Sequence, residues 1–358
     1  MSTPFRWAIL GTGSVSRKFA LGLNALGGRA IAASVASRDP ENARRFAHSL
    51  GIAHAAESWD DAIGPDIDGV YIASPATEHE AHARLAFAKG KPALIEKPLG
   101  PDAATARRIE DAAQQAGVFA MEALWTRFLP VIAQVKSAVE RGDLGDIRAY
   151  HGTFHAANVP DAQASLFDPV RAGGALLHRG IYPLSLARHF CGPITEVTAR
   201  GRLGETGVDE DITVILTHEN KALSTIQASL RTHATNKATL WGTQARVEIA
   251  APIWRPEAAR LIPTTAQPIL PARPRRFEAF RESRLGQRIA ALKTGMRGDG
   301  GTAMRAPPLG NGYAHEAQAL MDAVAAGAGQ STIMPLSESI EVLEAIDTAL
   351  AQIRKEPS

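Results

Sequence analysis

The sequence predicts an α/β protein: an N-terminal Rossmann domain with a doubly wound parallel sheet, followed by an α/β domain with a large open, mostly antiparallel sheet. Three observations predict it. Short apolar runs alternate with helical patterns as far as residue 125, later segments alternate apolar and polar residues, and 358 residues suffice for about two domains. We place the domains at 1–124 and 125–358.

The first domain contains short apolar runs, which are typical of strands covered on both faces. These strands are predicted at 6–10, 30–36, 69–73, 93–95 and 118–121. Helical patterns lie between them, at 14–26, 40–50, 78–89 and 102–116. Strands that alternate with helices in this way indicate a parallel sheet.

The second domain begins with one further predicted helix, at 127–140, and then changes pattern. Segments that alternate apolar and polar residues lie at 147–155, 194–201, 211–217, 223–229, 238–241 and 247–250. Such alternation is typical of an antiparallel or mixed sheet with one open face. Because an exposed sheet face often becomes a subunit interface, we expect a homodimer or homotetramer formed through it.

Composition and charge exclude several classes of function. The 39 basic and 37 acidic residues nearly cancel, so no global field attracts nucleic acid or an anionic membrane. The single cysteine, Cys191, cannot form an internal disulfide, which favours the cytoplasm. The N-terminus lacks a signal-peptide pattern, and no apolar stretch is long enough to span a membrane.

A basic insertion is predicted at about 271–300. Its basic residues are Arg273, Arg275, Arg276, Arg281, Arg284, Arg288, Lys293 and Arg297, against only Glu278 and Glu282. A nucleic-acid patch and a solvated, partly helical insertion both fit this composition, and we favour the second. The glycine-containing run 298–301 after it is predicted to be a flexible connector.

A glycine-rich turn joins the first predicted strand to the first predicted helix. It reads Gly11-Thr12-Gly13-Ser14-Val15-Ser16, the dinucleotide fingerprint G-x-G-x-x-G/A with Ser16 in the third place. Gly11 permits the tight turn, and Gly13 lets the backbone approach a pyrophosphate, whose charge then lies at a helix N-terminus. The turn therefore predicts a dinucleotide site.

The end of the second predicted strand indicates which dinucleotide binds. An NAD-preferring site usually has Asp or Glu there, whereas this chain has Ser37 followed by Arg38. A hydroxyl and a guanidinium suit a 2′-phosphate, so we expect NADP(H) rather than NAD(H). The alternative is that Arg38 is a surface residue and Asp39 contacts the ribose.

The motif Glu96-Lys97-Pro98 follows the strand predicted at 93–95. Open α/β sheets bind ligands at the carboxyl ends of their strands, so Lys97 is expected to point toward the nicotinamide and the substrate. Taken alone, a lysine at this edge is as compatible with a solvated side chain as with a catalytic one.

Together these motifs resemble the glucose-fructose oxidoreductase, inositol dehydrogenase and MocA family (Gfo/Idh/MocA). The matching segments, in order, are 11–16, Ser74-Pro75 with His79, 96–98, and 173–177 leading to 180–183. Within the family the chain is most similar to the branch of dimeric dihydrodiol dehydrogenase and NADP-dependent D-xylose dehydrogenase, through residues 121–128, 207–211 and 335–339. The resemblance covers nearly the whole chain except 253–307.

The resemblance implies a role for each matching residue. Lys97 matches the family's catalytic lysine, and Tyr182 falls where the family has its acid/base residue. The residues implied around the cofactor are Gly11, Thr12, Gly13, Ser14, Val15, Ser37, Arg38, Ser74, Pro75, His79, Glu96, Lys97, Trp125 and Arg127. An alcohol must lose a proton from oxygen as hydride leaves carbon, and we expect the Lys97 ammonium to favour the Tyr182 phenolate for that step.

One position departs from the family motif at the catalytic site. The family has Asp four residues before the acid/base residue, and this chain has His178. We expect His178 to hydrogen-bond the substrate or to act as the proton shuttle, because its free pKa of about 6.5 suits that task. Ala76 is a second departure, since many members have Asn there.

The sequence therefore predicts an NADP(H)-dependent oxidoreductase that acts on a sugar, polyol or vicinal diol. A catalytically impaired dinucleotide-binding sensor stays open as an alternative because of His178. An NAD-assisted glycosidase is a further alternative, against which Ser37 and Arg38 argue. His151, His155 and His178 lack the spacing of metal ligands, so we expect no metal.

Overall fold

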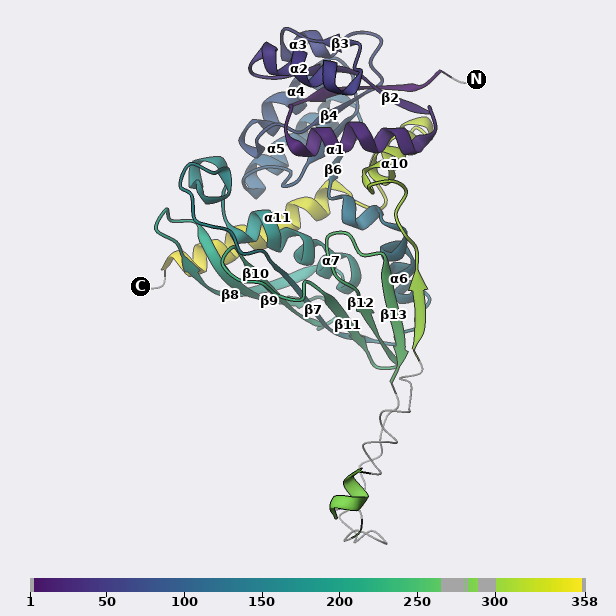
Figure 1. Ribbon diagram of the computed structural model, residues 1–358, viewed down its shortest axis with the longest axis vertical. Coiled ribbons are helices and arrows are strands. Elements are labelled where there is room, and N and C mark those ends of the chain that lie inside the picture. Colours follow the sequence, from purple (N-terminus) through teal and green to yellow (C-terminus); the bar gives the residue numbers. More distant parts are fainter. Residues whose placement is uncertain (1–2, 265–279, 281–282, 289–300, 356–358) are drawn as a thin grey trace.

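A computed structural model describes residues 3–264, 280, 283–288 and 301–355 (Figure 1). It contains a six-stranded sheet followed by an eight-stranded sheet. Figure 1 shows the first sheet with its helices in the upper part of the view and the second sheet below, with helix α11 (Leu336–Lys355) running between them. The predicted fold class is confirmed.

The first sheet is wholly parallel, with the strand order β3-β2-β1-β4-β5-β6. Its strands are β1 (Phe5–Leu10), β2 (Ala30–Ala36), β3 (His54–Ala55), β4 (Gly69–Ile72), β5 (Ala93–Glu96) and β6 (Ala120–Ala123). The chain reverses its order between β1 and β4, and ligands bind beyond the carboxyl ends of the strands at such a point. The fingerprint turn and Lys97 follow β1 and β5, so they share this edge.

Helices connect the strands of the first sheet. They are α1 (Ser14–Leu23), α2 (Pro40–Leu50), α3 (Trp59–Ala62), α4 (His79–Ala88) and α5 (Ala103–Ala116), with the 3₁₀ turns η1 (Asn24–Leu26) and η2 (Ala76–Glu78). The side chains of Asp39, Ser58 and Asp102 accept backbone N–H groups at the starts of α2, α3 and α5. Such caps satisfy donors that the first helical turn leaves unpaired, which fixes where these helices begin.

The second sheet has the strand order β14-β13-β12-β11-β7-β10-β9-β8. Its strands are β7 (Ile147–His155), β8 (Ile194–Leu203), β9 (Asp209–His218), β10 (Leu223–Ser229), β11 (Ala238–Gly242), β12 (Ala245–Ile249), β13 (Ala258–Pro263) and β14 (Thr302–Arg305). Among the described strands of this sheet, only β7 and β10 pair in parallel, and the other pairs are antiparallel. Ile215, Leu223 and Trp241 are exposed on the open face, as alternation predicts.

Helices cover the other face of the second sheet and link it to the first domain. They are α6 (Pro130–Glu140), α7 (Ile181–Cys191), α10 (Tyr313–Ala325) and α11, with the short turns η3 (Trp125–Phe128), η4 (Ser165–Phe167), η5 (Pro169–Arg171) and η6 (Leu176–Gly180). The helix predicted from residue 127 begins at Pro130, because proline suits the first helical position. Helix α10 packs against α1, so the C-terminal part of the chain returns to the first domain.

Two sequence predictions, the basic insertion and the domain boundary, are not tested by the structure. The basic insertion at about 271–300 lies almost entirely outside the described residues. The predicted domain boundary after residue 124 falls between β6 and η3, and it stays a prediction. Within the described ranges, no helix is both long enough and apolar enough to cross a bilayer.

Candidate active site

The fingerprint turn leaves the N-terminus of α1 open. Gly11 has a φ of +121°, and a Cβ there would lie 2.5 Å from the carbonyl oxygen of Ala73, so this position requires glycine. A Cβ at Gly13 would meet nothing within 4 Å. No side chain caps α1 and its first turn holds no acidic residue, so its N–H groups face outward as donors for an anion. This geometry fits the pyrophosphate of a dinucleotide.

Ser37 and Arg38 lie at the neighbouring strand end, beside the fingerprint turn. The Thr12 hydroxyl donates to the Ser37 hydroxyl at 3.3 Å. The Arg38 side chain is 75% exposed and forms an ion pair with Glu78 of η2. Asp39 caps α2 by accepting the N–H of Glu41 at 3.0 Å, so its carboxylate already has a structural partner.

His79 ties together the loops that follow β4 and β5. One ring nitrogen lies 2.9 Å from the Ser74 carbonyl oxygen, and the other lies 3.1 Å from that of Pro98. Burial lowers the pKa of His79 to about 4, so the ring is neutral at physiological pH. The side chain is fully enclosed, and it fixes the loop that carries Lys97. Ser74 also pairs its hydroxyl with His82 at 2.8 Å.

The three residues predicted to be catalytic meet at the carboxyl end of β5. The side-chain nitrogen of Lys97, Nζ, lies 5.3 Å from the centroid of the Tyr182 ring. The same nitrogen donates to the backbone carbonyl of His178 at 3.5 Å. Burial lowers the pKa of Lys97, and the Glu96 carboxyl partly opposes that shift. A lysine with a lowered pKa exchanges a proton more readily near neutral pH.

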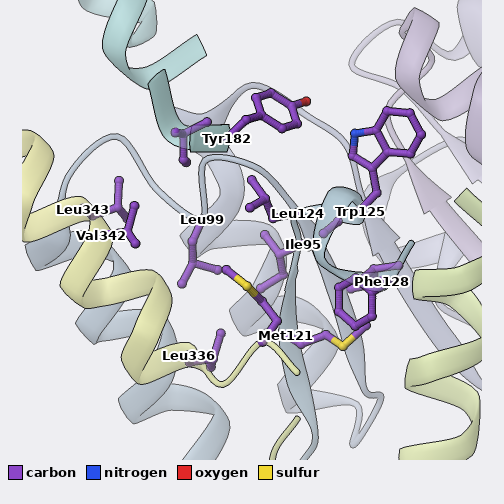
Figure 2. Packing of buried hydrophobic residues seen from close by; sticks show 14 of the residues in the cluster. Ile95, Leu99, Met121, Leu124, Trp125, Phe128, Tyr182, Leu336, Val342 and Leu343 are labelled. Atoms are coloured by element: carbon purple, nitrogen blue, oxygen red, sulfur yellow. The ribbon is translucent and has the colours of Figure 1, made fainter. Parts of the chain in front are cut away.

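The expected effect of Lys97 on Tyr182 is wrong. Burial raises the pKa of Tyr182, the Glu96 carboxyl raises it further, and Trp125 and Arg179 only partly offset this. Burial is the largest cause, although the Lys97 Nζ lies over the ring, 5.3 Å from its centroid. Figure 2 shows the Tyr182 hydroxyl directed toward the indole of Trp125. Tyr182 is therefore a neutral hydroxyl, suited to donate a hydrogen bond.

The prediction that His178 acts as a proton shuttle is also wrong. Burial lowers its pKa to about 3, and the positive charges of Lys97 and Arg179 add to that shift. At neutral pH the imidazole is uncharged and one of its nitrogens is protonated. A hydrogen bond to the backbone of Ala172 uses the ring N–H of His178, so the other ring nitrogen is an acceptor where the family pattern places a carboxylate.

Asp209 is a positioning residue that the sequence motifs did not single out individually. Its carboxylate accepts the backbone N–H of Leu176 at 2.7 Å, at the start of the π-helical turn η6 that carries His178. Gly174 has a φ of +125°, and a Cβ there would collide with that carboxylate. Burial raises the pKa of Asp209 to about 7. Because Asp209 and Leu176 are 33 residues apart, no local pattern signals this contact.

Glu96 occupies a buried position next to Lys97. Its carboxyl accepts the Tyr71 hydroxyl at 2.5 Å and the backbone N–H of Lys97 at 3.1 Å. Burial raises its pKa to about 7. Glu316 of α10 is also fully buried, and neither of its carboxyl oxygens has a hydrogen-bond partner among the described residues. Sequence motifs did not indicate Tyr71 or Glu316.

Arg127 and Trp125 lie in the turn η3 with different surroundings. The Arg127 side chain is buried, its Nε donates to the Ser185 hydroxyl at 2.7 Å, and it forms an ion pair with Glu338. All three guanidinium nitrogens donate to protein oxygens, so a cofactor contact by Arg127 stays a prediction. Trp125 stacks on Tyr313, with ring centroids 4.8 Å apart.

The part of the chain that the structure describes contains no group of three or more His, Cys, Asp or Glu side chains arranged to hold a metal ion. His151 and His155 lie on β7, and His178 lies on η6. The ring of His155 instead pairs with the Thr232 hydroxyl at 2.9 Å.

Fold and site define an oxidoreductase with a dinucleotide-binding Rossmann domain. Two family models match the chain. One describes the oxidoreductase family with an NAD-binding Rossmann fold and matches residues 5–124. The other describes the GFO/IDH/MocA C-terminal domain and matches residues 132–248. The chain belongs to the Gfo/Idh/MocA family, whose members are oxidoreductases that act on CH–OH groups.

Individual relatives agree with this assignment. Trans-1,2-dihydrobenzene-1,2-diol dehydrogenase of Macaca fuscata fuscata is 34% identical over 257 residues, which cover 70% of this chain and 76% of that one. Its counterpart from Oryctolagus cuniculus is 31% identical over 323 residues, with 88% and 89% covered. A solved levoglucosan dehydrogenase, in complex with NADH and levoglucosan, has a TM-score of 0.82 at 20% identity, with 99% and 98% covered. The predicted family and its dihydrodiol dehydrogenase branch are confirmed.

Proposed function

We propose that the protein is an NADP(H)-dependent oxidoreductase that transfers hydride between the nicotinamide and a sugar, polyol or vicinal diol. One observation carries this proposal: Lys97 and Tyr182 meet, 5.3 Å from nitrogen to ring centroid, at the sheet edge that also holds the open N-terminus of α1. A hydride acceptor bound along that edge would lie beside a pair of proton-handling groups.

Lys97 is the proposed proton acceptor in the oxidative direction. The bound nicotinamide supplies hydride chemistry, accepting hydride from the carbinol carbon or returning it. Lys97 takes the hydroxyl proton as the neutral amine, the form that its lowered pKa favours. Tyr182 donates a hydrogen bond to the same substrate oxygen, because its raised pKa keeps the phenol protonated. His178 contributes a neutral hydrogen-bonding side chain.

The proposed preference for NADP(H) rests on Ser37 and Arg38. Both follow β2, and neither brings a negative charge to the position where a 2′-phosphate would lie. The exposed Arg38 guanidinium can pair with that phosphate, while Asp39 is committed to the cap of α2. The ion pair with Glu78 competes with such a contact, so Glu78 is expected to limit the preference.

Assembly through the open face of the second sheet is part of the proposal. Ala149, Leu223 and Trp241 lie in one row across adjacent strands, because Trp241 pairs with Ala149 and Leu223 pairs with Ala149. Leu223 is 51% exposed and Trp241 is 38% exposed. Apolar side chains grouped on an open sheet face suit a second copy of the chain.

The proposal is tested by titrating the purified protein with NADPH and NADH, followed by turnover assays on aldoses, ketoses, polyols and cyclic diols. Tighter binding of NADPH with turnover of any panel member supports it. Nucleotide binding without turnover on the panel would instead favour the dinucleotide-binding sensor. Tightly held NAD with net hydrolysis of a glycoside would favour the NAD-assisted glycosidase.

A further inference from the structure

The π-helical turn η6 brings the guanidinium of Arg179 close to Lys97. His178 and Arg179 are adjacent on this turn, and Lys97 donates to the backbone carbonyl of His178 at 3.5 Å. The charge of Arg179 acts on Lys97, His178 and Tyr182, lowering the pKa of each. Arg179 therefore lies close to Lys97 and Tyr182, the residues proposed to act on the substrate hydroxyl.

Aromatic rings hold Arg179 in place. Its guanidinium carbon lies 5.1 Å from the centroid of the Phe154 ring, a distance typical of a cation–π contact. Phe154 stacks on Trp254 at 4.2 Å and is tilted against Tyr182 at 5.6 Å. The guanidinium thus shares an aromatic wall with the catalytic tyrosine, and the stacked rings offer an apolar face to a sugar ring.

Arg179 lacks the carboxylate partner that other enclosed arginines in this region have. Arg127 pairs with Glu338, and Arg188 pairs with Glu341 at 2.6 Å. Within the described ranges, Arg179 makes no ion pair, and its buried Nε has no hydrogen-bond partner. A half-buried guanidinium gains most from a planar anion that accepts two of its N–H groups.

Carboxylates near the site do not supply that anion. Glu96 is turned toward Tyr71 and the backbone N–H of Lys97, and burial raises its pKa to about 7. Glu122 accepts the backbone N–H of Leu99 at 2.9 Å. At position 178, where the family pattern has Asp, the side chain is an uncharged histidine. Arg179 is therefore a cation on the substrate side of the site without a carboxylate partner in the described part of the chain.

We propose that the substrate is a sugar or polyol that carries a carboxylate, bound through its carboxylate by Arg179. The hydroxyl that reacts lies with Lys97 and Tyr182, a few atoms from that carboxylate. On oxidation the carbinol carbon loses a hydride to the oxidised nicotinamide, the hydroxyl oxygen loses its proton to Lys97, and a carbonyl forms. The carboxylate itself is unchanged. This inference rests on the function proposed above and names the substrate class of the same site.

A carboxylate suits the site better than a phosphate does. One guanidinium offers a planar fork that matches a carboxylate in two parallel hydrogen bonds. A phosphate monoester carries close to two charges at neutral pH and is usually bound by several donors or a helix N-terminus. The starts of α2 and α5 at this sheet edge are capped by side chains, and the first turn of α4 carries Glu80. The uncapped start of α1 is assigned to the dinucleotide.

The test uses matched substrate pairs on the intact protein with saturating NADP⁺. D-Glucuronate is compared with D-glucose, and D-gluconate is compared with sorbitol. D-Glucose 6-phosphate tests whether a phosphate is preferred to a carboxylate. We expect kcat/KM for the acid to exceed that of its neutral partner about tenfold or more in at least one pair. This comparison needs no variant, so a failure of one to fold does not affect it.

Variants then assign the preference to Arg179. Arg179→Gln is expected to lower the ratio of acid to neutral kcat/KM about tenfold or more, chiefly through KM. Arg179→Lys keeps the positive charge but lacks the planar guanidinium. It is expected to restore part of the acid-to-neutral kcat/KM ratio. Arg171→Gln is the matched control, since Arg171 is an exposed neighbour paired with Asp168 at 2.7 Å.

Each outcome decides the inference. Equal or better turnover of the neutral partners, or an unchanged ratio in Arg179→Gln, overturns it while the proposed oxidoreductase function stands. Faster turnover of the sugar phosphate than of every acid also overturns the carboxylate assignment. Absence of turnover on the whole panel, with nucleotide bound, overturns the proposed function and this inference together.

Discussion

Arg38 and Glu78 form an ion pair at the edge of the dinucleotide site, between the loop after β2 and the turn η2. Glu78 therefore holds the guanidinium that is proposed to meet the 2′-phosphate. We predict that Glu78→Gln tightens NADPH binding several-fold and leaves NADH binding nearly unchanged. Arg38→Ala is predicted to weaken NADPH about tenfold or more, because a charge-assisted contact is lost. Fluorescence titration with both nucleotides measures these changes.

The comparison of NADPH with NADH separates phosphate binding by Arg38 from a structural role of this residue. Equal weakening of NADPH and NADH in Arg38→Ala would mean that Arg38 stabilises the loop rather than binding a phosphate. Arg45→Ala, on the outer side of α2, gives the background effect of removing a nearby surface cation.

The two glycines of the fingerprint turn are predicted to respond differently to alanine. Gly11→Ala places a Cβ 2.5 Å from the Ala73 carbonyl oxygen at a φ of +121°, so it should cost about 2 kcal/mol or more of stability. Gly13→Ala has free space around the new Cβ, so the free energy of unfolding should change by less than about 1 kcal/mol. Both should weaken dinucleotide binding at least about tenfold.

Urea unfolding and nucleotide titration of the two glycine variants check this prediction. Gly13→Ala is the informative one, because it separates binding from folding. Wild-type nucleotide affinity in a well-folded Gly13→Ala protein would contradict the placement of the pyrophosphate at the start of α1.

Asp209 is predicted to make the folded protein less stable as pH rises. Burial raises its pKa from 3.8 to about 7, so between these values the folded state binds more protons than the unfolded state. Stability from this group is complete below pH 3.8 and declines by about 1.4 kcal/mol per pH unit up to about pH 7. Asp209→Asn removes this titrating group. The free energy of unfolding of the variant, relative to that of the wild type, should therefore rise from pH 5 to pH 8.

Free energies of unfolding measured in urea at several pH values test the Asp209 prediction. His79 and Glu96 also titrate with altered pKa values, but they are present in both proteins and cancel in the difference. Parallel pH dependence of the variant and the wild type would show that Asp209 is not protonated on folding in this range.

The sequence predicted the strands and helices that have strong local patterns. Buried apolar runs such as 69–73 and 93–95 correspond closely to β4 and β5, since a central parallel strand is apolar on both faces. The two-residue strand β3 is too short to give a pattern. Helices α10 and α11 were not predicted, although α11 buries Leu336, Ile340 and Leu343 at helical spacing.

The candidate site was predicted only in part. Lys97, Tyr182 and His178 were identified from motifs, and they lie together in the structure. Their protonation was predicted incorrectly for Tyr182 and His178, because burial controls both pKa values and no motif reports burial. The contacts of Asp209 and Glu78 join separate segments, and local sequence does not encode them.

The most direct test of the proposed function is the rate of hydride transfer by Lys97→Ala and Tyr182→Phe, measured with the panel substrate that the wild type turns over best. We predict that each variant reduces kcat about a hundredfold or more while the dissociation constant for NADPH changes less than about threefold. Wild-type rates in both variants would contradict the assignment of proton transfer to Lys97 and of the hydrogen bond on the substrate oxygen to Tyr182.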